Sequence, residues 1–261
     1  MYGDATSGVI SVTTRGPQGK FFGGVELISS QLTDAYGYNS LGFSVGGPIL
    51  QKTDTNGVKS PIVGFFLSGQ GTYEKDPSPS YLKRYKLKDD KLKQIQEAPL
   101  VPSKTGTGFN RALEYVTADD FETIKARQNV ANRGFVLNGK IDIKAAKNTN
   151  ITLGGAYEYN NGHGFIYSYS LYNAENNPQS IGSSWRSYMR VTQKFGNANQ
   201  NTNDKEKDQS VIKNAFFSFL ASYEMTQSKT QDDTHKDRLF DYGYIGKFSR
   251  RFSEKENIYN Y

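Results

Sequence analysis

The chain has 261 residues and no cysteine, and it combines 36% hydrophobic residues with 18 Tyr, 16 Phe, 26 Gly and one Trp. Its longest apolar run, Pro61–Leu67, is far shorter than the roughly 20 residues that a spanning helix needs, which excludes a transmembrane α-helix. Lys and Arg number 32 against 26 Asp and Glu, a net charge of +6, but they are spread along the chain without the arginine-rich arm of a nucleic-acid binder.

Alternation of apolar and polar residues with a period of two dominates the first third of the chain and predicts β-strands. In the run from Lys20 to Gln31, for example, Val25 and Leu27 share a face opposite Glu26. Asn56-Gly57 supplies the positive φ that a chain reversal needs. The strands predicted here cover residues 10–14, 20–31, 41–49 and 63–73.

A long excursion follows, over about residues 75–133. A loop of this length is expected to contain structure of its own. The run from Asp89 to Glu97 predicts a short helix that ends before Pro99. Thr117-Ala-Asp-Asp120 is typical of a capping box, and it predicts a second helix through about Gln128.

The alternation returns after the excursion, and its polar side now carries charge. Ile141 and Ile143 share one face, while Lys140 and Asp142 share the other. Charged inner faces, with Tyr and Phe near the strand ends, are typical of a transmembrane β-barrel, although a soluble β-sandwich can produce the same pattern. The strands predicted here cover residues 136–144, 151–159, 185–192, 217–224 and 242–252, which makes about eight after the opening segment.

Connection lengths bear on orientation, since outer-membrane barrels have short periplasmic turns and long extracellular loops. If the strand at 20–31 rises from the periplasm, the gaps at about 75–133 and 161–182 fall outside, and the turn at 147–150 falls inside. The polar tract at 196–209 would also fall inside, where its length is unusual.

The first residues carry a resemblance to a known family. Tyr2-Gly-Asp-Ala-Thr-Ser-Gly-Val-Ile-Ser-Val-Thr-Thr-Arg15 resembles the closing segment of the plug domain in TonB-dependent receptors. Its Gly-Asp-Ala version is similar to transporters with a carboxypeptidase-regulatory-like domain, the broad relatives of starch-utilisation-type glycan importers. The similarity continues through Phe22-Gly-Gly-Val-Glu26, Gly42-Phe-Ser-Val-Gly-Gly-Pro48 and Gly64-Phe-Phe-Leu-Ser68. It is strong over about residues 1–80 and moderate to 160, and beyond that it rests on strand pattern alone.

The resemblance implies an all-β fold in which residues 1–17 end the plug and residues 18–261 begin an antiparallel transmembrane β-barrel. About eight of the family's roughly 22 strands would be present. The implied function is import of a glycan, siderophore or other scarce solute across the outer membrane of a Gram-negative bacterium. The implied partners are outer-membrane lipid and the TonB–ExbB–ExbD complex, with a surface substrate-binding lipoprotein left open as a third.

The chain is expected to be a fragment. Met1-Tyr2-Gly3-Asp4 lacks the basic and apolar regions of a signal peptide, so we expect the natural N-terminus to lie upstream. About eight strands would leave two unpaired edges in lipid, so the fragment is not expected to transport by itself. One alternative is a small secreted or outer-membrane β-sheet module that binds glycans. Nucleic-acid binding, which would show salt-sensitive affinity, ranks last and is not predicted.

Candidate site residues are few. In the aromatic stretch at 165–172, Tyr167, Tyr169 and Tyr172 are weak candidates for stacking on a sugar at the extracellular mouth, and loop packing or an interfacial aromatic girdle is the simpler explanation.

Metal binding and catalysis are not predicted, and no cofactor is expected. Asp232-Asp-Thr-His235 and Asp119-Asp120 could supply metal ligands, but a solvated loop and helix capping explain these groups more simply. There is no P-loop, and no Ser/His/Asp set stands out from the background, so no enzymatic activity is expected.

Overall fold

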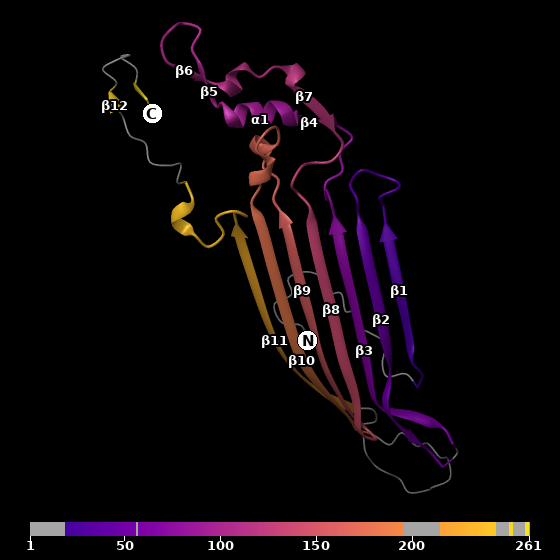
Figure 1. Ribbon diagram of the computed structural model, residues 1–261. Helices are drawn as coiled ribbons and strands as arrows, with labels where there is room; N and C mark the ends of the chain where they lie inside the picture. The colour runs from indigo at the N-terminus through magenta and orange to yellow at the C-terminus, as the bar shows by residue number, and fades with distance from the viewer. Residues whose placement is uncertain (1–18, 56, 196–214, 244–250, 253–258, 261) are drawn as a thin grey trace.

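The structure is a computed structural model that describes residues 19–55, 57–195 and 215–243, and the backbone of 251–252 and 259–260. It is mostly β, and one seven-stranded antiparallel sheet accounts for most of it (Figure 1). Each strand pairs with the next strand of the sheet along the chain. In order across the sheet, the strands are β1 (Phe22–Ser29), β2 (Asn39–Thr53), β3 (Lys59–Glu74), β8 (Asn132–Ala146), β9 (Thr149–His163), β10 (Gln179–Phe195) and β11 (Ala215–Gln231).

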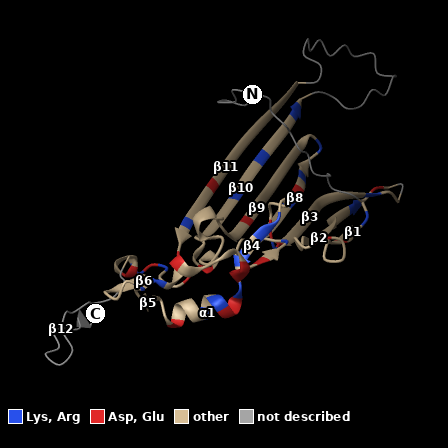
Figure 2. Ribbon diagram, turned by 90° about the horizontal axis from the view of Figure 1, so that it is seen from above, with Lys and Arg blue, Asp and Glu red and all other residues tan. Residues whose placement is uncertain are grey.

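The sheet is curved, and in the described part of the chain it is not closed: β1 and β11 are its two edges (Figures 1 and 2). Within this sheet, the six strands other than β1 are 15 to 17 residues long, which exceeds the ~9–11 residues that a tilted strand needs to cross a bilayer. Seven of the eight predicted strands are therefore confirmed as strands of one antiparallel sheet.

Short and long connections lie at opposite ends of the sheet. The turns at 54–58 and 147–148 lie at one end, and the connections at 30–38, 75–131 and 164–178 lie at the other. The predicted placement of the two long gaps at the same end is thus confirmed. The polar tract at 196–209, the plug-like segment 1–17 with its predicted strand at 10–14, and most of the predicted strand at 242–252 lie outside the described residues.

The long connections fold into small elements beyond the end of the sheet (Figure 1). We call residues 75–131 and 164–178 the loop cluster. Its elements are β4 (Arg84–Leu87), α1 (Asp89–Glu97), β5 (Leu100–Pro102), β6 (Phe109–Arg111), β7 (Phe121–Ile124) and the 3-10 turns η1 (Ala112–Tyr115), η2 (Ala118–Asp120), η3 (Tyr167–Tyr169) and η4 (Ala174–Asn176). After β11 the chain forms η5 (Leu239–Asp241) and the pair of short strands β12 (Arg251–Phe252) and β13 (Tyr259–Asn260).

One of the two predicted helices of the loop cluster is confirmed. The helix α1 spans the predicted residues, with Asp89 and Asp90 in its first turn, where carboxylates favour the positive end of the helix dipole. The chain leaves the helix at Ala98, directly before Pro99, which cannot continue it.

The predicted helix from Thr117 to Gln128 is wrong beyond its first turn. Asp120 accepts a hydrogen bond from the backbone N–H of Thr117 at 2.8 Å, as a capping box requires, but only the 3-10 turn η2 forms there. The chain then extends as β7 and pairs with β4, with Phe121 opposite Leu87 and Ile124 opposite Arg84. Aromatic and β-branched residues favour extended backbone, and a partner strand from earlier in the chain decides the outcome.

The buried apolar side chains do not lie in the sheet. In the described part of the chain they all belong to the loop cluster: Leu87, Ile95, Ala126, Val130 and Ala174. The sheet instead exposes large apolar side chains, including Leu41 (56% exposed) and Tyr223 (59% exposed). A sheet with an exposed apolar face is incomplete as a folding unit in water, because burial of that face is what stabilises a sheet.

Candidate functional site: a two-faced sheet and its loop cluster

The register of the sheet sorts its side chains onto two faces. One row crosses all seven strands and is apolar throughout: Val25, Phe43, Gly69, Leu137, Tyr157, Trp185 and Met225. The row two residues further toward the short turns is Val45, Leu67, Gly139, Gly155, Ser187 and Tyr223. We call this side of the sheet the apolar face.

The apolar face has a definite height. On β8 it runs from Phe135 to Ile143, and at about 3.4 Å per residue this is about 27 Å along the strand. For a strand tilted by about 35–45° this length corresponds to a height of about 19–22 Å, which is most of the ~25 Å apolar band of an outer-membrane barrel. Aromatic side chains occur near both limits of this band, at Tyr159 and Phe219, but Tyr223 also lies in its central row, that of Gly139.

The other face, which we call the polar face, carries paired charges. Lys140 and Asp142 form an ion pair at 3.1 Å, and Thr152 donates a hydrogen bond to the same carboxylate at 2.6 Å. Arg186 and Glu224 face each other across β10 and β11 with an N–O distance of 2.8 Å. The charges that alternate with apolar residues in the sequence are therefore segregated on one side of the sheet.

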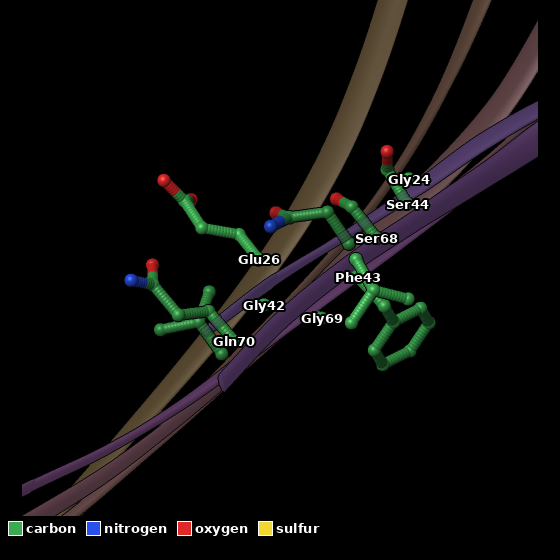
Figure 3. Close-up of a pocket in the computed structure, with 11 residues that line it drawn as sticks. Gly24, Glu26, Gly42, Phe43, Ser44, Ser68, Gly69 and Gln70 are labelled. Atoms are coloured by element: carbon green, nitrogen blue, oxygen red, sulfur yellow. The ribbon is translucent and has the colours of Figure 1, made fainter. Parts of the chain in front are cut away.

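The polar face is hollowed over β1, β2, β3 and β8. The hollow has a volume of about 390 Å³ and is lined by Glu26, Ser44, Ser68, Gln70 and Asn138, among others. Figure 3 shows the Glu26 carboxylate projecting from the side opposite to the Phe43 ring. Gly24 and Gly42 leave room for the hollow because neither fills it with a side chain.

The loop cluster is organised around a buried ion pair. The Asp76 side chain is 0% exposed, and one of its oxygens accepts from Nε and an Nη of Arg127 at 2.8 and 2.6 Å. The backbone N–H groups of Arg127 and Ser78 complete its shell. Burial by itself would raise the pKa of Asp76, but the hydrogen bonds from Arg127 and Ser78 outweigh it, so the pKa lies below its ordinary value.

A second buried polar group joins the two long insertions. Asn177 is 2% exposed, and its side-chain amide donates to the backbone carbonyls of Gln128 and Asn129. Its side-chain oxygen accepts from the backbone N–H of Ile166. Asn129 adopts a φ of 46° and donates in return to the Ala174 carbonyl. The insertions at 75–131 and 164–178 therefore form one structure.

The three predicted tyrosines are not gathered at one site. Tyr167 is 85% exposed and lies on the rim of a cavity of about 140 Å³. Tyr172 borders a different cavity, of about 510 Å³. Tyr169 is half-buried in η3. The groups that sequence reasoning missed are Asp76 and Arg127, which lie 51 residues apart and belong to no local motif.

The other polar groups considered from the sequence have structural partners. Asp232 accepts from the backbone N–H groups of His235 and Thr234; these bonds, led by that of His235, lower its pKa. His163 lies 2.9 Å from the Asp233 carboxylate. Gly106 and Gly108 have φ values of 88° and 82° in the turn between β5 and β6, a conformation that favours glycine. No group of three or more metal-ligating side chains occurs in the described ranges.

The comparisons with known proteins assign no family to this chain. No helix in the described part of the chain combines the length and apolar character needed to cross a membrane. No family model matches the sequence, and neither a curated protein nor a solved structure matches it.

Proposed function

We propose that the sheet is part of the wall of a transmembrane β-barrel in the outer membrane of a Gram-negative bacterium. The observation that carries the proposal is the apolar row from Val25 to Met225, which crosses all seven strands and exposes five of its seven residues to solvent, on a sheet that buries no apolar side chain among its described residues. Lipid acyl chains would cover this face, and the charged pairs of the polar face would line the interior.

The two edges of the sheet also support a larger barrel. In the described residues β1 and β11 each have a neighbour on one side only. Unpaired backbone N–H and C=O groups cost several kcal/mol each in hydrocarbon, so these edges need further strands within a bilayer. The wall described here would be one part of a closed structure.

We further propose that the chain belongs to a TonB-dependent transporter, which imports a scarce solute with energy delivered by the TonB–ExbB–ExbD complex. This step rests on the resemblance of residues 2–15 and of the first barrel-like strands, and on the placement of long loops at one end of the sheet. In the bacterium that carries the gene, uptake through this protein should stop when TonB is deleted; uptake that continues at the normal rate would contradict the proposal.

The membrane placement has a direct test, because Leu137 and Asn138 are neighbours on β8 that project from opposite faces. Leu137→Arg puts a charge on the apolar face at a cost of up to about 2–4 kcal/mol, the value at the bilayer midplane, or up to about 30- to 1000-fold in membrane partitioning, whereas Asn138→Arg puts it on the polar face. The single tryptophan, Trp185, reports insertion, since lipids with brominated chains should quench its emission. Equal losses for the two variants, or no quenching of the parent chain, would rule out this placement.

A second candidate is a secreted β-sheet module that binds glycans in the hollow of the polar face, where Glu26 and Gln70 offer hydrogen bonds to hydroxyl groups. It predicts a monodisperse protein in buffer whose Trp185 is indifferent to brominated lipid, and a loss of glycan binding in Glu26→Gln.

A further inference from the structure

The small cavity of the loop cluster brings cationic side chains together around one aromatic ring. Its volume is about 140 Å³, and Lys83, Arg84, Arg127, Phe165, Tyr167 and Ser170 contribute to its lining. The guanidinium carbon of Arg127 lies 4.8 Å from the centre of the Phe165 ring, and that of Arg84 lies 5.9 Å from it. No carboxylate is among the described residues that line this cavity.

The two arginines differ in how their charge is balanced. Arg127 is paired with the buried carboxylate of Asp76. Arg84 and Lys83 have no ion-pair partner in the described part of the chain. Of the two arginines beside the Phe165 ring, only Arg127 therefore has a compensating carboxylate. The cavity carries an excess of positive charge.

Arg84 also has a buried donor without an acceptor. Its Nε atom is inaccessible to solvent and forms no hydrogen bond with the described residues. Buried polar groups are almost always hydrogen-bonded, and an unsatisfied donor in a native protein calls for a specific explanation. A bound anion would supply the missing charge, and one of its oxygen atoms would reach this N–H after a small movement of the Arg84 side chain.

We infer that this cavity is a binding site for a phosphate group or a similarly compact oxyanion. The guanidinium group presents its N–H donors in a fork that matches phosphate oxygens, and Lys83, an exposed residue of the lining, adds a point charge. The volume corresponds to about four or five water molecules at ~30 Å³ each, which admits one such group and excludes a whole oligosaccharide. The anion is either carried by a soluble ligand or belongs to the head group of a neighbouring lipid.

The inference does not depend on the membrane assignment, so it can be tested on the full chain in a non-ionic detergent that carries no phosphate. The probe is inorganic phosphate, titrated at constant ionic strength with chloride as the balancing anion. The reporter is the Nε–Hε signal of Arg84 in a ¹H–¹⁵N spectrum, assigned by its absence in Arg84→Lys. We expect a saturable shift of this signal in the parent chain. The affinities of the variants, which lack the signal, are measured by titration calorimetry with phosphate, and we expect at least a tenfold loss of affinity in Arg84→Met.

Arg111→Met is the matched control, because Arg111 is an exposed arginine of the same loop cluster, in β6. It should bind phosphate like the parent chain. If Arg84→Met does not fold, Arg84→Lys, which retains the charge and loses the Nε donor, should still weaken binding severalfold. Absence of saturation with phosphate, or equal loss in the Arg84 and Arg111 variants, would overturn the inference.

The source of the anion is decided by a second arm. In nanodiscs that contain lipid with phosphate head groups accessible to the loop cluster, a head-group site predicts an Arg84 signal that is already shifted and resists added phosphate. A site for a soluble ligand predicts the same titration as in detergent.

Discussion

Replacing Asp76 by Asn is the most informative perturbation of the loop cluster. The substitution keeps the shape of the side chain but removes the charge that compensates Arg127, whose side chain is 11% exposed. Loss of one partner from a buried ion pair costs about 3–5 kcal/mol, because the remaining charge is left unpaired. The Phe165 ring still faces the guanidinium group at 4.8 Å and offsets part of the loss, so we expect a value near the lower end, about 3 kcal/mol.

Hydrogen exchange of the backbone amides measures this cost where it arises. A loss of about 3 kcal/mol corresponds to roughly a 150-fold fall in protection. We expect this fall in peptides that cover residues 76–80 and 124–131, with little change in β8 and β9, because the sheet makes its own backbone ladder. Asp119→Asn, at an exposed carboxylate in η2 of the same cluster, serves as the control.

A double variant separates the ion pair from general damage. In Asp76→Asn combined with Arg127→Gln, the uncompensated charge is gone, so protection should recover in part. Unchanged protection in Asp76→Asn, or an equal loss in Asp119→Asn, would refute the assigned role. A uniform loss over β8 and β9 would show that the loop cluster and the sheet are one cooperative unit.

Three further outcomes are expected from the same features. Because the pKa of Asp76 is lowered in the folded chain, the stabilisation by its carboxylate is fully present above the ordinary carboxyl pKa of about 3.9 and is lost as the pH falls through the lower folded value. Amide protection at residues 124–131 should decline over that pH range, and Asp76→Asn should remove this pH dependence. Leu87→Ala, at a side chain 2% exposed, should destabilise the loop cluster by about 2–5 kcal/mol, whereas Leu82→Ala, at one 76% exposed, should change the protease sensitivity of the cluster little. Gly155→Ala brings a methyl group to 2.9 Å from the Arg186 carbonyl oxygen and should lower the free energy of unfolding, measured with denaturant, by about 1–3 kcal/mol. Gly139→Ala, directly opposite on β8, meets only a Leu67 methyl at 3.7 Å and should be tolerated.

The sheet could be predicted from the sequence because each of its strands carries its own signal. Alternation at Lys140–Ile143 reports the face of each residue, and Asn56-Gly57 reports a turn, without knowledge of distant residues. The helix at Asp89–Glu97 could be predicted for the same reason, since its acidic first turn and the following proline are local. The strand ends are less well marked: β10 begins at Gln179, six residues before the predicted start.

The loop cluster could not be predicted in this way, because its contacts join residues that are distant in the chain. The capping box at Thr117 is real, but it specifies one turn, and the pairing of Phe121 with Leu87 determines the extended conformation of the next residues. The cavity with Arg84 and Phe165 likewise requires both insertions to be in place. The aromatic stretch at 165–172 does supply the ring that the two arginines face. That ring is Phe165, however, and not one of the three predicted tyrosines.

The location of the buried core has a consequence for the order of folding. Pairing of β2 with β3 and of β8 with β9 closes the two short turns, and such local contacts form fast. The loop cluster instead depends on contacts such as those of Tyr36 with Ser80, Asp76 with Arg127 and Gln128 with Asn177, which are separated by 44 to 51 residues. Once β3 has paired with β8, the ends of the first insertion are held together, and most of the entropy of closing these contacts has already been lost. We therefore expect the hairpins to form first and the loop cluster to consolidate last, so that its surface cavities become available to ligands only after the sheet has formed.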